Sequence, residues 1–191
     1  MFKNNRILIV DDDQGIRNSY KQSLLPLQKS ETLQKGMALF GDKTADADSG
    51  ETIVYDLTFA KNGEAGVEYA TQAKEQGNAY AVAFVDMQMP GIDGAETCKR
   101  LWKIDPDIKI VIVTAFSKYT PDQIIAIAGR DDLFYVRKPF NTHEIRQFAR
   151  VLTHQWNLER EKQQLIHDLE MANQKLEKKV QEQSLMLNEC D

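Results

Sequence analysis

Short apolar segments alternate with amphipathic ones along the first 152 residues. Residues 6–10, 79–86 and 108–113 form almost wholly apolar runs, as expected of strands that are buried on both faces. Residues 53–60 and 133–136 predict two further strands, and a helix-forming segment follows each of the five. Those helices are expected over residues 14–25, 64–76, 94–104 and 121–129, and from residue 142 onward. Five strands alternating with helices predict a doubly wound α/β domain with a parallel sheet.

Side chains suited to phosphate chemistry stand where these strands end. They are Asp11, Asp12 and Asp13 after the first strand, Asp86 at the end of the third, Thr114 after the fourth and Lys138 after the fifth. Parallel strands bring their carboxyl ends to one edge of the sheet, so these groups are expected to share one crevice. Asp13 alone is most simply a helix cap. So much like charge predicts a cation, and Mg²⁺ is the candidate because it binds carboxylate oxygens and keeps several waters.

Asp86 is the candidate nucleophile of this crevice. Attack by its carboxylate on a phosphoryl group would give an aspartyl phosphate, a covalent species that carboxylates form in catalysis. Phosphoryl transfer depends mainly on positioning and on neutralising three equatorial oxygens. Mg²⁺, the Lys138 ammonium, and the Thr114 hydroxyl with loop amides would each cover one oxygen. The sequence therefore predicts a Mg²⁺-dependent phosphoryl acceptor.

Composition argues against several classes of function. The chain has 191 residues, of which 42% are hydrophobic, and its formal charge of −5 gives no basic footprint for nucleic acid. No apolar run approaches the roughly 18 residues of a membrane span, and the acids at 11–13 follow too soon after the N-terminus for a secretory signal. The only cysteines are Cys98 and Cys190, which suits a reducing compartment. We expect a cytoplasmic protein that binds neither nucleic acid nor membrane.

Four strand ends carry specific motifs. They are Ile7-Leu8-Ile9-Val10-Asp11-Asp12, Val85-Asp86-Met87-Gln88-Met89-Pro90-Gly91-Ile92-Asp93-Gly94, Val113-Thr114-Ala115 and Arg137-Lys138-Pro139-Phe140. In order and residue type, this set resembles the receiver domain of two-component response regulators, over about residues 6–152. The resemblance implies a flavodoxin-like sheet with strand order 2-1-3-4-5. It also implies that a sensor histidine kinase or phosphotransfer protein phosphorylates Asp86 from a phosphohistidine.

The resemblance also implies a set of ligands around Asp86. Asp12 would bind Mg²⁺ directly, Asp11 would bind it directly or through water, and the backbone carbonyl of Gln88 would complete the protein ligands. Lys138 would pair with the phosphoryl group, and the bond between Lys138 and the proline after it would be cis, a form found essentially only before proline.

A conformational switch is implied as well, together with one departure from the family pattern. Thr114 would swing toward the phosphate, and Tyr135 fits the aromatic residue that moves with it. Gln88 and Phe116 occupy positions that influence phosphate lifetime in this family. About 25 extra residues, around 29–53, separate the first helix from the second strand, which the family usually joins in a few residues.

The last helix continues well past the expected end of the domain. Its spacing assigns Ile166, Asn173, Val180 and Leu187 to heptad a positions and Leu169, Leu176 and Gln183 to d positions. This pattern favours a parallel two-stranded coil, so we expect a parallel homodimer through residues 153–191. Upstream, Glu159 and Lys162 fall on the same seam, which makes the register weak or shifted there, and Leu158 and Leu165 form a competing stripe.

The domain organisation expected from the sequence is thus a receiver over residues 1–152 and a coiled-coil extension over residues 153–191. Residues 176–182 look like the signalling helices that feed output domains, and we expect such a domain after Asp191. Two rival functions remain at this point. One is a Mg²⁺-dependent phosphohydrolase with an aspartyl nucleophile, which would also need an acid/base residue and a pocket for the leaving group. The other is a dimerisation module whose receiver is unused, and the charge-rich tail could also be a solvated single helix.

Overall fold

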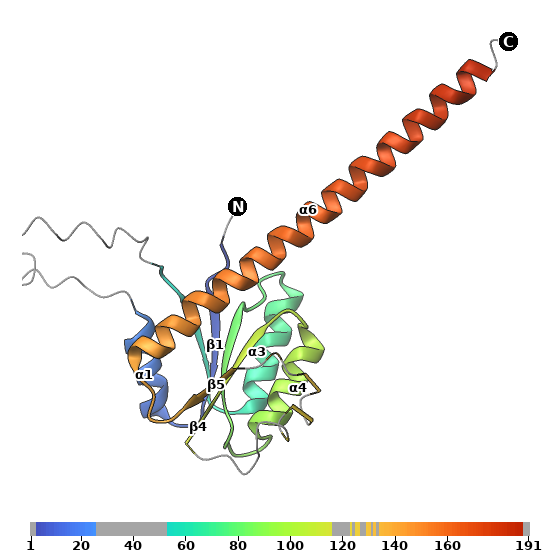
Figure 1. The fold of residues 1–191 in the computed structure, drawn as a ribbon. Helices are drawn as coiled ribbons and strands as arrows, with labels where there is room; N and C mark the ends of the chain where they lie inside the picture. The colour runs from blue at the N-terminus through green and yellow to red at the C-terminus, as the bar shows by residue number, and fades with distance from the viewer. Residues whose placement is uncertain are drawn as a thin grey trace, which may run out of the picture.

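A five-stranded parallel sheet forms the centre of the molecule, with helices on both faces (Figure 1). The computed structural model describes residues 3–25, 53–115, 123, 125–126, 129–130, 132 and 134–188, with the side chains of 182 and 184–188 left out. The strands are β1 Arg6–Val10, β2 Asp56–Ala60, β3 Val82–Asp86, β4 Lys109–Thr114 and β5 Phe134–Arg137. The helices are α1 Gln14–Leu24, α3 Gly63–Glu75, α4 Gly94–Ile104 and α6 Thr142–Asn188. The order β2-β1-β3-β4-β5 confirms the predicted strand order.

The element bounds differ from the predictions at several strand ends. β2 begins at Asp56, three residues later than predicted, because its partner strand β1 begins at Arg6, the residue that pairs with Asp56. Residues 53–55 therefore have no strand residue beside them. β4 and β5 each lie one residue further along the chain than predicted. Phe116, Cys190, most of the helix predicted over 121–129 and nearly all of the insertion around 29–53 lie outside the described residues.

Each face of the sheet packs against two of the described helices. Because side chains alternate along a strand, Ile7 and Ile9 of β1 join the cluster beneath α1 and α6, whereas Leu8 and Val10 join the cluster beneath α3 and α4. All four are fully buried. Burial on both faces explains why β1 and β3 read as unbroken apolar runs in the sequence.

The sequence of α3 offers Val67, Tyr69 and Ala70 for packing, and for Tyr69 this expectation is wrong. Tyr69 is exposed, and the buried residues of α3 are Gly63, Gly66, Ala70 and Ala73. A Cβ added to Gly66 would lie 2.8 Å from a methyl carbon of Val10, so α3 approaches β1 too closely for a larger side chain. The small residues of α3 set this short helix–sheet distance.

The long helix α6 has two parts. Its N-terminal turns pack on the sheet through Ile145, Ala149 and Leu152, which are fully buried. The helix then leaves the domain as a single rod (Figure 1), and every side chain described after residue 160 is exposed. The predicted long C-terminal helix is thus confirmed. Within the described ranges, no helix combines the length and the hydropathy that crossing a bilayer requires.

Polar contacts fix α6 where it leaves the domain. The Asn4 N–H donates to Asn157 Oδ1 over 2.7 Å, and Asn157 Nδ2 donates back to the Asn4 carbonyl over 2.9 Å. Lys109 Nζ lies 2.6 Å from Glu159 Oε2, and Arg160 lies 2.9 Å from Asp107 Oδ2. We call these contacts the basal clasp. Their partners stand at the N-terminal ends of β1 and β4, opposite the edge where Asp86 lies.

Candidate functional site

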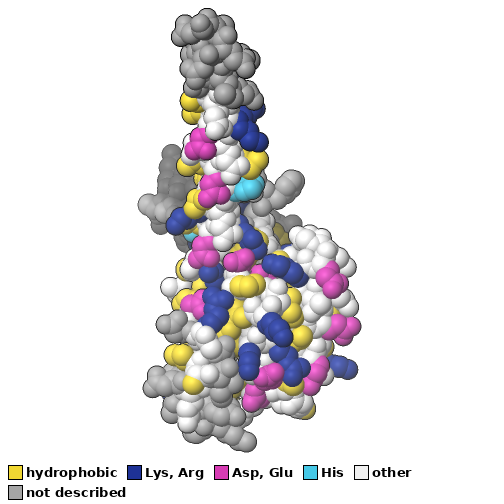
Figure 2. All heavy atoms as spheres, turned by 90° about the vertical axis from the view of Figure 1, so that its right-hand side faces the viewer, with side chains coloured by type: hydrophobic (Ala, Val, Ile, Leu, Met, Phe, Trp, Pro, Cys, Tyr) yellow, Lys and Arg dark blue, Asp and Glu magenta, His cyan; other side chains and the backbone are white. Residues whose placement is uncertain are grey.

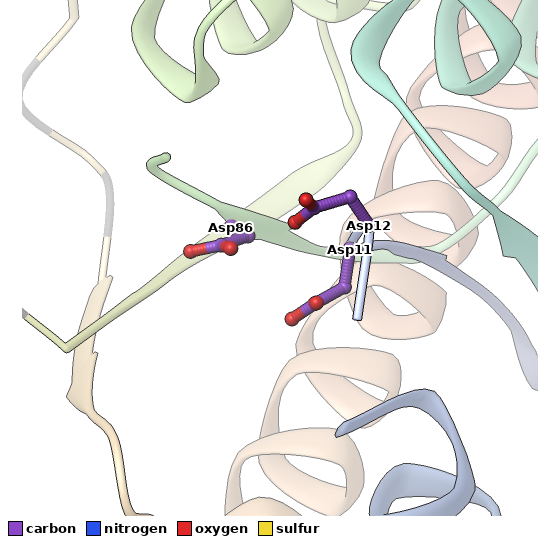
Figure 3. A group of neighbouring side chains, drawn as sticks. All are labelled: Asp11, Asp12 and Asp86. Carbon is purple, nitrogen blue, oxygen red and sulfur yellow. The ribbon is translucent and has the colours of Figure 1, made fainter. Parts of the chain in front are cut away.

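Three carboxylates meet beyond the C-terminal ends of β1 and β3 (Figure 3). Asp11 and Asp12 follow directly on β1, and Asp86 is the last residue of β3. One oxygen from each can be chosen so that all lie within 4.8 Å of one another. Asp11 and Asp86 are buried, and Asp12 is exposed. The sequence therefore placed these acids correctly, because β1 and β3 are neighbours in a parallel sheet.

Lys138 reaches into this group of acids from the end of β5. Its Nζ lies 2.7 Å from Asp11 Oδ2 and 3.0 Å from Asp86 Oδ2. The Lys138 N–H also donates to the Thr114 carbonyl over 2.8 Å, which extends the β4–β5 pairing beyond the strand. The peptide bond between Lys138 and Pro139 is cis, as predicted.

The site carries more formal negative than positive charge. Burial raises the pKa of Asp11, while the hydrogen bond and charge of Lys138 oppose the rise. Burial also acts against the Lys138 ammonium, but the hydrogen bonds to Asp11 and Asp86 outweigh it and raise the pKa of Lys138. One ammonium then faces three carboxylates, a formal charge of +1 − 3 = −2 when all are ionised. Oxygen ligands and this charge suit one divalent hard cation.

Two buried hydroxyls stand near this edge without a hydrogen-bond partner among the described residues. They are Thr114 Oγ1 and the phenol oxygen of Tyr135. Tyr135 pairs with Ile112 across β4 and β5, so the side chains of Thr114 and Tyr135 share the sheet face that α3 and α4 cover. Burial raises the pKa of Tyr135 to about 12, which keeps it a neutral hydrogen-bond donor. Buried polar groups left unpaired are costly, so each hydroxyl would gain from a new acceptor.

The loop from Asp86 to α4 is held by residues that the sequence did not single out. The Ile92 N–H donates to Glu64 Oε1 over 3.1 Å, and Gly91, at φ 87°, lies against the same carboxylate. The Gln88 N–H lies 3.4 Å from Asp86 Oδ1, and the Gln88 side chain is exposed. The α3 N-terminus thus supports the loop that follows Asp86. Glu64 is an exposed acid in a helix, so no sequence pattern marks this role.

Gly94 fixes how closely α4 approaches Asp86. A Cβ at this position would clash with the Asp86 carbonyl oxygen and lie 2.6 Å from Met87 Cα, both of which are backbone atoms. Gly94→Ala should therefore lower the free energy of unfolding by about 1–3 kcal/mol, as overpacking does, despite the better helix propensity of alanine. Urea denaturation measures this change.

Gly15→Ala is the matched control for Gly94→Ala. Gly15 also lies in the first turn of a helix, but among the described residues the only neighbour of its added Cβ within 4 Å is a side-chain oxygen of Asp13 at 3.1 Å. We expect the free energy of unfolding to change by no more than about 0.5 kcal/mol, as for most surface substitutions. Equal stability of the two variants would contradict a tight contact at Gly94.

Sequence comparison relates the chain to one family. The profile described as the response regulator receiver domain matches residues 51–150, more than half of the chain. The heme response regulator HssR of Staphylococcus aureus is 31% identical over 106 residues, which make up 56% of this chain and 46% of HssR. The chain therefore spans about half the length of the curated relatives it matches. The profile match begins after β1, yet β1 is an inner strand of the same sheet, between β2 and β3.

Solved structures share the fold. A CheY-like response regulator receiver domain protein from Methanospirillum hungatei superposes with a TM-score of 0.57 at 22% identity, covering 81% of this chain and 98% of that one. A structure described as adenylate cyclase from Rhodopirellula baltica gives a TM-score of 0.59 at 21% identity, covering 86% and 98%. At these identities the likeness shows a common architecture.

Proposed function

The chain belongs to the response regulator receiver domain family, and we propose that it accepts a phosphoryl group on Asp86 from a sensor histidine kinase or phosphotransfer protein. One observation carries the proposal: Asp86 shares Lys138 with Asp11, at 3.0 Å and 2.7 Å, beyond the carboxyl ends of the strands. An anionic nucleophile, a fixed ammonium and two further acids are the parts that phosphoryl transfer to a carboxylate needs.

In the proposed transfer, an Asp86 carboxylate oxygen attacks the phosphorus of a phosphohistidine. The new bond joins that oxygen to phosphorus, the bond from phosphorus to the imidazole nitrogen breaks, and the departing nitrogen keeps the electron pair and takes up a proton. The Lys138 ammonium, 3.0 Å from Asp86 Oδ2, can donate to an oxygen of the incoming group. Its link to Asp11 holds it in place before the donor arrives.

Asp11, Asp12 and Asp86 would hold Mg²⁺, with the Gln88 backbone carbonyl as a further ligand. The fit rests on three carboxylate oxygens within 4.8 Å of one another and on the uncompensated formal charge of −2. Bound Mg²⁺ would neutralise charge on the phosphoryl oxygens as the bond to Asp86 forms.

Thr114 and Tyr135 would convert phosphorylation into a conformational change. The Thr114 hydroxyl, which has no acceptor among the described residues, would turn toward a phosphoryl oxygen, and Tyr135 would move with it. Their unpaired state supports this role because a new acceptor stabilises them only in the phosphorylated form. Coupling of this kind is typically worth about 1–3 kcal/mol.

The output would pass through residues 153–191 in a parallel homodimer, with residues 1–152 as the receiver, in the cytoplasm. Support comes from large apolar side chains that stand exposed on the projecting part of α6 (Figure 2). They are Leu158, Leu165, Ile166, Leu169, Met171, Leu176 and Val180. An isolated helix gains nothing from such residues, whereas a second helix would bury them.

A small phosphodonor tests the acceptor role without a cognate kinase. The full chain is incubated with acetyl phosphate or phosphoramidate and Mg²⁺, and its intact mass is measured. We expect the mass of one phosphoryl group to appear, to depend on Mg²⁺, and to be lost at alkaline pH, as for an acyl phosphate. Borohydride trapping and peptide mapping should then place the group on Asp86. A stable adduct on serine, threonine or histidine would contradict the proposal.

A further inference from the structure

Two residues of the seam expected for the dimer helix already contact the receiver. Counting back by sevens from Ile166, that seam would pass through Glu159 and Leu152. Leu152 is fully buried in the core between α6 and the sheet. Glu159 bonds to Lys109 in the basal clasp, over 2.6 Å. Leu152 cannot face a second helix, and Glu159 would have to give up its contact with Lys109 to do so, which favours a different seam near the domain.

The outward face of α6 carries a different stripe with heptad spacing. Val151, Leu158 and Leu165 follow one another at seven-residue intervals, and they are 53%, 56% and 64% exposed. Residues seven apart lie on one side of a helix, as in a coiled-coil seam. Val151, His154 and Leu158 line a groove beside α6 together with receiver residues such as Asn5 and Asp56, so the described part of the receiver borders this side of α6 without burying it.

We propose that a second copy of this chain packs its own α6 along Val151, Leu158 and Leu165, in parallel. This interface rests on the homodimer of the proposed function and specifies where the two helices meet. A two-fold axis along the helices puts the same stripe on both copies, so the apolar residues face each other. Lys162, between Leu158 and Leu165 on the stripe, can extend its ammonium to solvent.

The stripe continues into the seam predicted further along the helix, so the contact between the two helices is not interrupted. From Leu165 the next seam positions are Leu169, Asn173 and Leu176, at steps of four, four and three. Those steps add up to eleven residues, a spacing that locally unwinds the left-handed supercoil. The clasp explains why the change of register falls here: it holds Glu159 against the receiver, and the helix is free of the domain only beyond it.

Disulfide cross-linking between copies tests this register. In a full-length Cys190→Ser background, with Cys98 buried, single cysteines are placed at 158, 159, 165, 166 and 176, and the dimers formed by mild oxidation are counted on a non-reducing gel. We expect Leu158→Cys and Leu165→Cys to cross-link several-fold faster than Glu159→Cys and Ile166→Cys, because a disulfide needs Cα atoms within about 7 Å. The 165 and 166 pair is decisive, because both variants leave the clasp intact.

Leu176→Cys separates failure of the register from failure of the dimer, because position 176 lies on the seam in either case. Faster cross-linking at 166 than at 165, with 176 positive, would overturn the proposed stripe and leave the homodimer standing. Cross-linking at one position only, out of 158, 165 and 176, would indicate antiparallel helices and overturn it as well. Absence of cross-links at all five positions would contradict both the homodimer and this interface. It would leave the acceptor role of Asp86 untouched, because phosphoryl uptake is measured separately by mass.

Discussion

Asp86→Asn is expected to reduce phosphoryl uptake to background. The amide oxygen of asparagine is uncharged and a poor nucleophile, so no acyl phosphate can form at this position. The fold should persist, because the amide oxygen can still accept a hydrogen bond from Lys138, which lies 3.0 Å from Asp86 Oδ2 in the wild type. Intact-mass measurement with a small phosphodonor and Mg²⁺ checks the loss, and circular dichroism checks the fold.

Asp13→Asn is the matched control for this substitution. Asp13 belongs to the same run of acids, but its side chain caps α1 by accepting from the Gly15 and Ile16 N–H groups. Asparagine caps helices as well as aspartate does, so this variant should take up phosphate like the wild type. Uptake by the Asp86 variant equal to that of the control would show that a different carboxylate is the acceptor.

The strand ends were predictable because their chemistry and their position in the sequence are local. Each buried strand reads as a short apolar run, and the polar residue that ends it stands at the sheet edge whatever the loops do. Asp86 and Lys138 are 52 residues apart, yet the parallel order alone brings them together. The separation of β1 from β2 by residues 26–52 did not disturb this result, since β1 still pairs with both β2 and β3.

The buried face of α3 could not be predicted in the same way. A hydrophobic count favours Tyr69 and gives no weight to Gly66, yet Gly66 faces Val10 and Tyr69 faces solvent. What decides the face is the distance between helix and sheet, which no residue of the helix encodes alone. Glu64 escaped notice for a similar reason, since its partner is the Ile92 N–H, 28 residues away.

The register of α6 near the domain was also left open by the sequence. Leu165 and Ile166 are both apolar, so either can belong to a seam, and the pattern alone does not choose. The choice comes from tertiary contacts: Lys109 binds Glu159 from 50 residues away, and the core takes up Leu152. Contacts of this kind follow from the folded domain and not from the helix sequence.

Lys138→Met should affect stability and phosphorylation together. The Lys138 side chain is 12% exposed and its partners Asp11 and Asp86 are 1% and 8% exposed, so its removal leaves buried carboxylates without their cation. Breaking one side of a buried ion pair costs about 3–5 kcal/mol of unfolding free energy. The phosphorylation rate should fall about 100- to 1,000-fold, as when one fixed donor to a transition state is removed. Urea denaturation at neutral pH and timed phosphodonor labelling measure the two effects.

The pH dependence of the stability deficit, the unfolding free energy that Lys138→Met loses, distinguishes an electrostatic effect from lost packing. The pKa of Lys138 is raised in the folded protein, so the stability from its charge is present below its unfolded pKa of about 10.4 and is lost only as the pH rises through the folded value. The full deficit should thus appear at neutral pH. Burial already raises the pKa of Asp11, and removing the ammonium that opposes this effect raises it further. The variant should regain stability relative to the wild type as the pH falls and Asp11 takes up a proton.

Lys109→Met separates the buried site from an ordinary ion pair. The Lys109 side chain is as well covered as that of Lys138, at 11% exposed, but its partner Glu159 is 42% exposed and can be solvated when the lysine is lost. Lys109→Met should lower the free energy of unfolding by at most about 1 kcal/mol, as for surface ion pairs. If the two lysine variants lose equal stability, or if the Lys138 deficit does not change between neutral and acidic pH, the carboxylates around Lys138 do not depend on its charge. The electrostatic account of the site would then be wrong, even if Asp86 proved to be the acceptor.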